Sequence, residues 1–471
     1  MLFNSFTFLI LFLPPVLAIA LRLKGQRLLC WISLTSFVFY AFAGHVWFII
    51  PMLITTCLDF CMAPLIAQAD TRGKKRCFLL ISVAGNLGLL FYFKYFGLFA
   101  RTAAAASSWI AGLLGQPNPH FAFTAMEVIL PAGISFYTFQ TLSYIIDVYR
   151  GQAPPERNFW RFSSFVSFFP HLVAGPLTRH HQLIPQLTRI AQTGITPRWE
   201  HGIYLFAIGL CKKVLIGDRI ATFVHPLLSS PEHMTALTAW LALLGFTLQI
   251  YFDFSGYSDM ALGLGRLFGI ELPQNFNSPY KASNPSDFWR RWHITLSQWL
   301  RDYVYITLGG NRLGTARRYT NIMLTMVIGG LWHGANWTFA MWGFYHGTLL
   351  VLFHLTEKTW LRAPYLVQRG ATFILISIGW LFFKSASWAE AQNWLGHLFI
   401  ISGPLLPLGE VELKLALLVA GGLCITQLFP NASSVPNLAT LRPSYKFALG
   451  VATAVALSML NYSSRFLYFQ F

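Results

Sequence analysis

The chain has 471 residues, of which 55% are hydrophobic and only 11% are charged. A soluble domain carries roughly 25% charged residues, and a soluble core of this size cannot hide 43 Phe and 16 Trp. The net charge of +17 does not indicate nucleic-acid binding, because the basic residues gather in short loops between apolar runs. The composition predicts an all-α, polytopic integral membrane protein in which residues 1–471 form one domain.

Apolar runs of about 20 residues recur from end to end, and a helix of that length crosses a hydrocarbon layer of about 30 Å. We expect about 11 to 12 transmembrane helices from these runs, with interfacial or re-entrant helices in addition. Their predicted bounds are 4–22, 29–46, 48–67, 77–100, 129–148, 202–218, 236–262, 320–336, 338–356, 369–385, 411–429 and 445–462. The first run lacks a basic start and a cleavage site, so we expect a retained span rather than a signal peptide.

Basic residues concentrate in four short loops, 22–27, 70–76, 149–161 and 309–319. Short basic loops remain on the cytoplasmic side of a membrane, so we expect these loops to face the cytoplasm. Their charge also favours anionic membrane lipids as partners.

The segment 162–177 is apolar but short, and Pro170 and Pro176 interrupt it. We expect it to be interfacial or re-entrant and covered by protein, because lipid cannot satisfy the freed backbone groups. The cysteines lie in or beside apolar segments without a set of metal ligands, so we expect small core residues and no metal site.

The stretch 250–347 is richer in Asp, Asn, Trp and His than the rest of the chain. Polar groups at membrane depth cost free energy and mark functional positions. Asp253 and Asp259 stand in an apolar frame, where we expect them to line a cavity or to lock helices together. Residues 285–302 alternate apolar residues with Arg, which predicts an amphipathic helix in the membrane interface. His293 would then lie near the boundary between water and lipid.

The motif GGLWHGANWTFAMWGFYHG (329–347) contains two histidines in predicted spans. Glycines surround His333, and small residues allow another helix or a substrate to come close. Trp332 and Asn336 add polar groups, so we expect a narrow, partly wet cavity around His333. On one continuous helix, His346 would lie about 20 Å from His333 and on the opposite face. We therefore expect His346 to be structural.

The remaining candidate for a companion of His333 is His293, which only folding can bring close. The chain has no G-x-S-x-G elbow, Walker A loop or H-E-x-x-H motif. A neutral imidazole can take a proton from a hydroxyl and return it to a leaving group, which acyl transfer from a thioester to an alcohol requires. Bis-histidine haem ligation and proton-coupled transport, with His333 as the relay, are the alternatives.

The segments DFWRRWHITLSQWLRDYVYITLGGNR (287–312) and 329–347 together resemble the membrane-bound O-acyltransferase family, in its bacterial branch around alginate O-acetyltransferase. Residues 130–151, 165–177 and 249–280 resemble the same branch, and the resemblance weakens after residue 385. It implies a ring of tilted helices thinned at the centre, with a tunnel across the membrane and a motif-bearing core at about 130–350.

The resemblance also implies roles for individual residues. The family's key intramembrane histidine falls on His333, in LWHG, and its upstream histidine falls on His293, in RRWH. His333 would act as the general base on an acceptor hydroxyl, while His293 would orient the thioester or stabilise charge. Asn336 is a candidate donor to the developing oxyanion, with Trp332 in support.

The implied activity moves an acetyl group across a bacterial inner membrane to O-acetylate an exported alginate, cellulose or peptidoglycan. Acetyl-CoA or an acyl-carrier thioester would be the co-substrate, with no bound cofactor. Extracytoplasmic acetyl-transfer proteins would be partners. Arg290, Arg291 and Arg301 are candidates to meet donor phosphates, or to anchor lipid headgroups instead.

We predict that cysteines introduced at Gly73 and Gln152, in a chain whose native cysteines are replaced, resist a membrane-impermeant thiol reagent in intact cells. They should react after permeabilisation, because both lie in basic loops. Labelling of Gly73→Cys in intact cells would show that the orientation is wrong, and the donor side with it.

Overall fold

The computed structural model describes residues 1–42, 44–116, 129–229, 234–399, 409–434, 441–462 and 467. Within these residues the regular structure is helical, with long α-helices joined by short π- and 3-10 helices. The predicted all-α class is confirmed.

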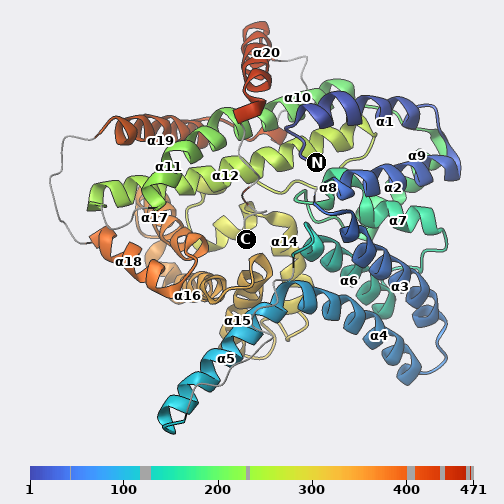
Figure 1. The fold of residues 1–471 in the computed structure, drawn as a ribbon, viewed down its shortest axis with the longest axis horizontal. Coiled ribbons are helices and arrows are strands. Elements are labelled where there is room, and N and C mark those ends of the chain that lie inside the picture. Colours follow the sequence, from blue (N-terminus) through green and yellow to red (C-terminus); the bar gives the residue numbers. More distant parts are fainter. Residues whose placement is uncertain are drawn as a thin grey trace.

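The elements fall into three groups along the chain (Figure 1). The first group consists of η1 (Thr7–Phe12), α1 (Leu13–Ala20), α2 (Gly25–Ala41), α3 (Ile49–Gln68), α4 (Arg72–Leu90), η3 (Phe91–Tyr95), α5 (Phe96–Leu113), α6 (Ile134–Arg150), α7 (Phe159–Ser167), α8 (Phe169–Leu172) and α9 (His180–Thr193). The second consists of α10 (Trp199–Cys211), η5 (Lys212–Gly217), α11 (Asp218–Ser229) and α12 (Ala236–Leu267). The third consists of α13 (Pro285–Arg291), α14 (Ile294–Leu300), η8 (Arg301–Tyr305), α15 (Thr315–His333), α16 (Trp337–Trp360), α17 (Tyr365–Lys384), α18 (Trp388–Phe399), α19 (Glu410–Leu428) and α20 (Pro443–Ser458).

Among the described residues, five helices are long and apolar enough to cross a membrane. They are Val46–Gln68, Arg72–Leu113, Ala236–Leu267, Tyr365–Lys384 and Glu410–Ser434, and each coincides with a predicted span. The other predicted spans form helices that are shorter, such as α2 and α6, or rich in Trp, His and Thr, such as α16. The polytopic character is therefore observed, and the number of 11 to 12 crossings stays a prediction.

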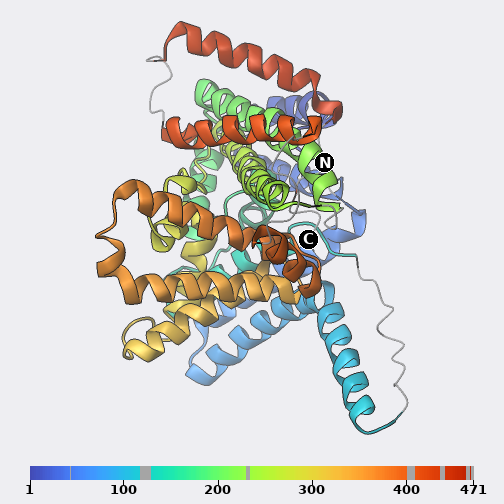
Figure 2. The ribbon, with the colours of Figure 1, turned by 90° about the vertical axis from the view of Figure 1, so that its left-hand side faces the viewer.

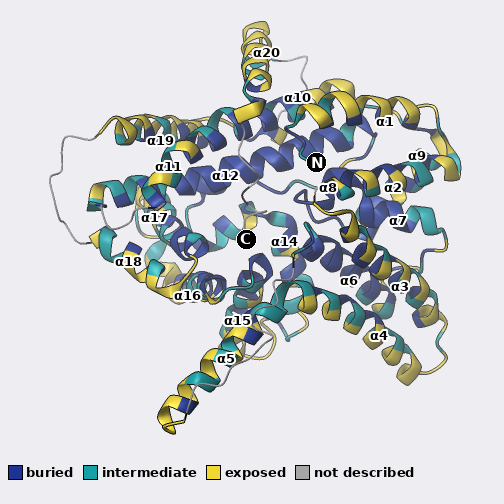
Figure 3. Cartoon of the chain, viewed as in Figure 1, coloured by how far each residue is buried: buried dark blue, intermediate teal, exposed yellow. Residues whose placement is uncertain are grey.

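Helix α12 is the long central element, and it is buried along most of its length (Figure 3). Helices α10, α11 and α19 lie beside it, while α14 sits near the middle of the view (Figure 1). Helices α5 and α20 extend from the body and are largely exposed (Figures 2 and 3). The first part of the polar stretch, on α12, thus lies in the interior, whereas residues 311–317 before α15 are exposed.

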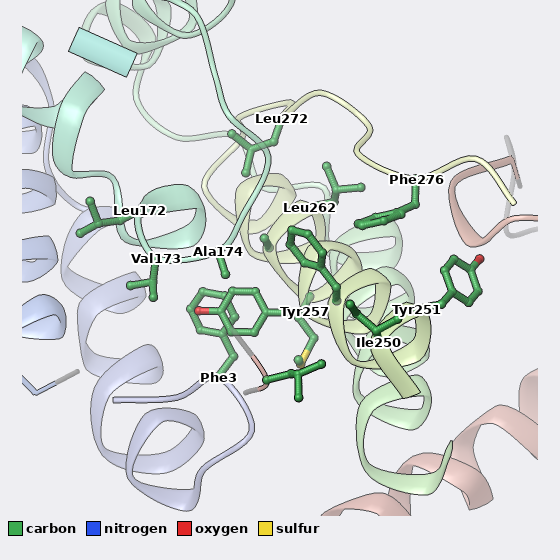
Figure 4. Packing of buried hydrophobic residues seen from close by; sticks show 14 of the residues in the cluster. Phe3, Leu172, Val173, Ala174, Ile250, Tyr251, Tyr257, Leu262, Leu272 and Phe276 are labelled. Carbon is green, nitrogen blue, oxygen red and sulfur yellow. The ribbon is translucent and has the colours of Figure 1, made fainter. Parts of the chain in front are cut away.

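The N-terminal segment and the segment around Val173 both pack against α12. The ring of Phe3 stacks on Tyr257 of α12, with 4.6 Å between ring centroids and an interplanar angle of 21° (Figure 4). The backbone around Val173 borders the same cluster. Such aromatic pairs stabilise by about 0.5–1.5 kcal/mol beyond their buried area, so they hold the N-terminus against the centre.

Asp253 and Asp259 lock α12 to η5. Lys213 Nζ lies 2.5 Å from Asp253 Oδ1 and 2.7 Å from Asp218 Oδ1, and Lys212 Nζ lies 2.5 Å from Asp259 Oδ2. These side chains are nearly inaccessible to solvent, and a buried charge is stable only when it is paired. Of the two predicted roles, helix locking is the one that the structure confirms for both aspartates.

The segment 162–177 forms two short helices, α7 and α8, that are interrupted at Phe168. Nearly every residue of this segment is buried. Gln140 Nε2 on α6 donates to the backbone oxygen of Phe165 at 2.6 Å. The prediction of a broken segment covered by protein is confirmed, because neighbouring side chains satisfy its backbone.

The predicted amphipathic helix at 285–302 is wrong, because the chain breaks at His293. This residue has a φ of 41° in the left-handed region and begins a new helix, α14. Two backbone hydrogen bonds replace helical ones there: Asn277 N donates to Arg291 O and Ile294 N donates to Asn275 O, each at 2.9 Å. His293 is 0% exposed, so it lies in the protein interior. Its depth near the boundary between water and lipid stays a prediction.

Helices α15 and α16 form a tight antiparallel hairpin. A Cβ atom on Gly343 would collide with the backbone oxygen of Met326, and one on Gly330 with that of Phe339. Only glycine permits two helix backbones to come this close. The glycines near His333 therefore admit a second helix, which is one of the two roles predicted for them.

We predict that Gly343→Ala destabilises the protein, because overpacking at a backbone contact costs about 1–3 kcal/mol. Thermal unfolding in detergent should show a lower melting temperature. Gly370→Ala is the matched control, since a Cβ on Gly370 meets no atom within 4 Å, and Ala has the higher helix propensity. Equal melting temperatures for the two variants would contradict the close helix contact.

Candidate active site

A cavity of about 500 Å³ lies between α13, α14, η8, α15 and α16. Its lining includes His333, the last residue of α15, and Arg318 near the start of the same helix. The two positions are about 20 Å apart along the helix axis. His354 on the antiparallel α16 lies at the Arg318 end, so the cavity runs from a cationic mouth toward His333.

The mouth also receives Arg290 and Arg301, which are exposed. Burial raises the pKa of Asp302, but hydrogen bonds from Arg301 and Arg179 outweigh it and hold that pKa below its ordinary value. Asp302 is therefore a carboxylate, and it offsets part of the charge of Arg301. Within the described part of the chain, neither Arg290 nor Arg318 forms an ion pair, which leaves the mouth with positive charge for an anion.

His333 sits in an aromatic surround and is 6% exposed. The centroid of its ring lies 5.0 Å from that of Trp332, 5.1 Å from that of Trp342 and 5.3 Å from that of Phe383. The ring of His293 is 6.2 Å away. The fold thus brings together two histidines that are 40 positions apart in the sequence.

Asn275 holds His293 in one orientation. Asn275 Oδ1 lies 3.1 Å from His293 Nδ1 and also accepts from Thr295 Oγ1 at 2.9 Å, while Asn275 Nδ2 donates to Ser258 Oγ at 3.3 Å. An amide oxygen only accepts hydrogen bonds, so His293 Nδ1 carries the hydrogen. In the neutral ring Nε2 then keeps its lone pair, and it has no hydrogen-bond partner among the described residues.

Trp332 stands against both histidine rings, at 5.0 Å from His333 and 5.7 Å from His293. Its indole is 3% exposed, and Nε1 donates to the backbone oxygen of Ser135 at 3.4 Å. Trp332 therefore adjoins both histidines without lining the cavity itself, and its supporting role stays a prediction.

Asn336 is directed elsewhere. Its side-chain oxygen caps α16 by accepting from Thr338 N at 3.1 Å, and its Nδ2 donates to the backbone oxygen of Ala386 at 2.7 Å. It borders a separate apolar cavity with Trp337 and Trp388. Both polar groups of Asn336 have structural partners, so this arrangement does not favour Asn336 as a donor to an oxyanion.

The three candidate arginines separate in the structure. Arg290 and Arg301 line the cavity, but Arg291 does not. Arg291 Nε donates to Asp287 Oδ1 at 2.9 Å, and its NH1 group donates to Asn277 O at 3.4 Å. Arg291 stabilises the break after α13 instead of the mouth.

The continuous helix assumed for His333 and His346 is wrong, because the chain reverses at 334–336. His346 is fully buried, and the indole of Trp342 contacts both rings, at 5.1 Å from His333 and 4.8 Å from His346. His346 does not line the cavity, and neither does His293, so the lining does not distinguish these two histidines. The structural role of His346 stays a prediction.

Sequence reasoning missed Arg318, His354, Asn275 and Lys94. Arg318 and His354 are polar residues near helix ends, and no spacing marks them as cavity residues. Asn275 carries no motif of its own. Lys94 did have a signal, since it is a lone charge inside a predicted span, and such a residue indicates function by default.

Comparison with known proteins identifies the class. The sequence profile of the membrane-bound O-acyltransferase family matches residues 157–388. The chain belongs to this family, as its similarity to proteins of known name also shows. It is therefore an integral-membrane O-acyltransferase.

The relatives narrow the comparison within the family. The chain is 37% identical to a probable alginate O-acetylase AlgI of Pseudomonas putida, across 100% of both chains. It is 42% identical to the protein of that name in Pseudomonas aeruginosa, over 82% of this chain and 72% of the relative. It is 36% identical to a peptidoglycan O-acetyltransferase of Helicobacter pylori, over 79% of this chain and 74% of the relative.

We predict that His293→Ala lowers acyl transfer by at least about 100-fold, the lower range for loss of a positioned proton-transfer group. His346→Ala should mainly lower the melting temperature, because it leaves a cavity among buried indoles. Rates per folded protein, measured on purified samples at equal expression, separate the two effects. A fully expressed His346→Ala variant without activity, beside an active His293→Ala variant, would contradict the assignment.

Proposed function

We propose that the protein takes an acetyl group from a cytoplasmic thioester donor for O-acetylation of an exported polysaccharide. The observation that carries this proposal is a cavity that runs from the cationic residues Arg290 and Arg318, beside His354, to the histidine at the end of α15. The names of its relatives, alginate O-acetylase and peptidoglycan O-acetyltransferase, support a polysaccharide acceptor.

The shape and charge of the cavity favour a thioester with an anionic head and a slender arm. Phosphate groups would meet Arg290 and Arg318 at the mouth, since guanidinium groups bind phosphate in two-pronged geometry. The path between mouth and His333 is lined by apolar side chains such as Ile322 and Met326. Acetyl-CoA fits this description as the co-substrate, and an acyl-carrier thioester presents the same arm.

His333 would act as the general base. Its imidazole accepts the proton of the acceptor hydroxyl while that oxygen attacks the thioester carbonyl carbon. The carbon–sulfur bond then breaks, and the thiolate takes the proton back from the imidazolium. The products are an acetyl ester and a free thiol. His293, fixed by Asn275, would orient the thioester or stabilise the developing charge.

The position of the basic loops supports a cytoplasmic side of donor entry. Arg150 NH2 donates to Thr307 Oγ1 at 2.9 Å, so the basic loop 149–161 adjoins the residues that follow η8, and Arg301 and Tyr305 of η8 line the cavity. A cytoplasmic position of that loop supports donor entry from the cytoplasm of a bacterial inner membrane. The acceptor would approach His333 from the extracytoplasmic side, where separate acetyl-transfer proteins would complete delivery to the polymer.

Membership of an acyltransferase family favours this function over a proton-coupled transporter. It also disfavours haem ligation, the other alternative.

We predict that His333→Ala lowers acetyl-CoA-dependent acetyl transfer by at least about 100-fold while the protein inserts and folds. Purified protein in lipid nanodiscs would be supplied with acetyl-CoA, and free thiol release and polymer ester content would be measured. An acetylated carrier protein supplied in parallel distinguishes the two donors.

His45→Ala is the matched control, because His45 is an exposed histidine outside the cavity. It should retain wild-type rates. Near-normal acetylation by His333→Ala at equal expression would overturn the general-base role.

A further inference from the structure

We propose that Lys94 is a positioning residue, which fixes the helix end that presents His333 to the substrate. This inference rests on the proposed function, because it assumes that His333 acts on the acyl donor. Lys94 lies in the π-helical segment η3, far from the histidine motifs in sequence, and no step of the chemistry above uses it.

The ammonium group of Lys94 makes three hydrogen bonds. It donates to the backbone oxygen of Trp332, to that of His333 at 3.3 Å and to Ser135 Oγ at 3.0 Å. A lysine ammonium has three donors, so this set uses all of them. The side chain therefore ties η3 to the end of α15 and to the start of α6.

The end of α15 needs such partners. The last four carbonyl groups of a helix receive no hydrogen bond from an N–H group within the helix. Helix α15 ends at His333 because the backbone of Gly334 is extended, with a φ of −157°. Tyr95, the next residue of η3, donates its hydroxyl to the backbone oxygen of Leu331 at 2.9 Å. Two consecutive residues of η3 thus bind three consecutive carbonyls, those of 331–333.

The partners of Lys94 differ in kind from those of the interior lysine Lys213. Lys213 is paired with two carboxylates, whereas no acidic side chain forms an ion pair with Lys94 within the described ranges. Its Nζ instead lies at the carbonyl end of α15, where N–H donors stabilise a helix C-terminus. Removing these donors should loosen the turn that carries Trp332 and His333 while leaving the donor mouth, at the other end of α15, unchanged.

The test compares Lys94→Met, Lys94→Arg and the control Arg101→Met in full-length protein in nanodiscs. Arg101 is an exposed cation on the adjoining helix α5 and has no hydrogen bond to α15. Initial rates of acetyl-CoA thioester cleavage give kcat and KM per folded protein. Hydrogen exchange of peptides covering 327–336, followed by mass spectrometry, reports the helix end directly.

We expect Lys94→Met to lower kcat at least 30-fold with KM within threefold of wild type, and to speed exchange at 327–336 at least tenfold. Lys94→Arg should recover at least a third of the lost activity on a logarithmic scale, since a guanidinium also donates to carbonyls. Arg101→Met should have the kcat, KM and exchange rate of the wild type. A Lys94→Met variant with a kcat within threefold of wild type, or one in which only KM changes, overturns the positioning role alone. Absence of His333-dependent cleavage in the wild type overturns the proposed function, and this inference with it.

Discussion

The short pairing between residues 275–277 and 291–294 is the constraint on which the site depends. Two backbone hydrogen bonds and the amide of Asn275 interrupt what would otherwise be a single amphipathic helix. The interruption turns His293 inward, and it separates α13 from α14. Without it, the two histidines would not share Trp332 as a common neighbour, and the cavity would lose one wall.

Polar groups in this apolar interior are held by specific partners, and different sets of partners join different groups of helices. Lys212 and Lys213 bind aspartates of α12 and fasten helices that lie away from the cavity. Asp59 of α3 accepts from Ser82 and Asn86 of α4 and fastens the first group of helices in the same manner. In both sets, the buried polar side chains are paired with an opposite charge or with a hydrogen-bond donor. The two histidines lie apart from these sets, in a largely aromatic environment.

Much of the architecture could be predicted from the sequence, because composition and apolar run length decide whether a chain enters a membrane. The pairing of His293 with His333 came from motif resemblance, and the structure agrees in geometry. The break at His293 was not predictable, since WRRWHIT alternates like a surface helix while its partner, Asn275, lies 18 positions upstream. A local pattern carries no information on a distant backbone partner.

The same reason explains why individual roles were misassigned. Arg290 and Arg291 are neighbours of identical type, yet one lines the cavity and the other binds Asp287. Asn336 stands near His333 in sequence, but its position before α16 makes it a helix cap. Lys94 lies outside the polar stretch, yet a single charge in an apolar run indicates function more strongly than one charge among many.

The glycine contact between α15 and α16 has a mechanical consequence. Where two backbones touch, no side chain can rotate to make room, so we expect α15 and α16 to move together as one rigid body. Any change in the bore of the cavity during a catalytic cycle must then come from the facing wall of α13, α14 and η8, which is built of short helices joined by a non-helical break. The proposed general base, His333, would then stand on the stiff side of the cavity, and the more compliant side would be the one proposed to receive the donor.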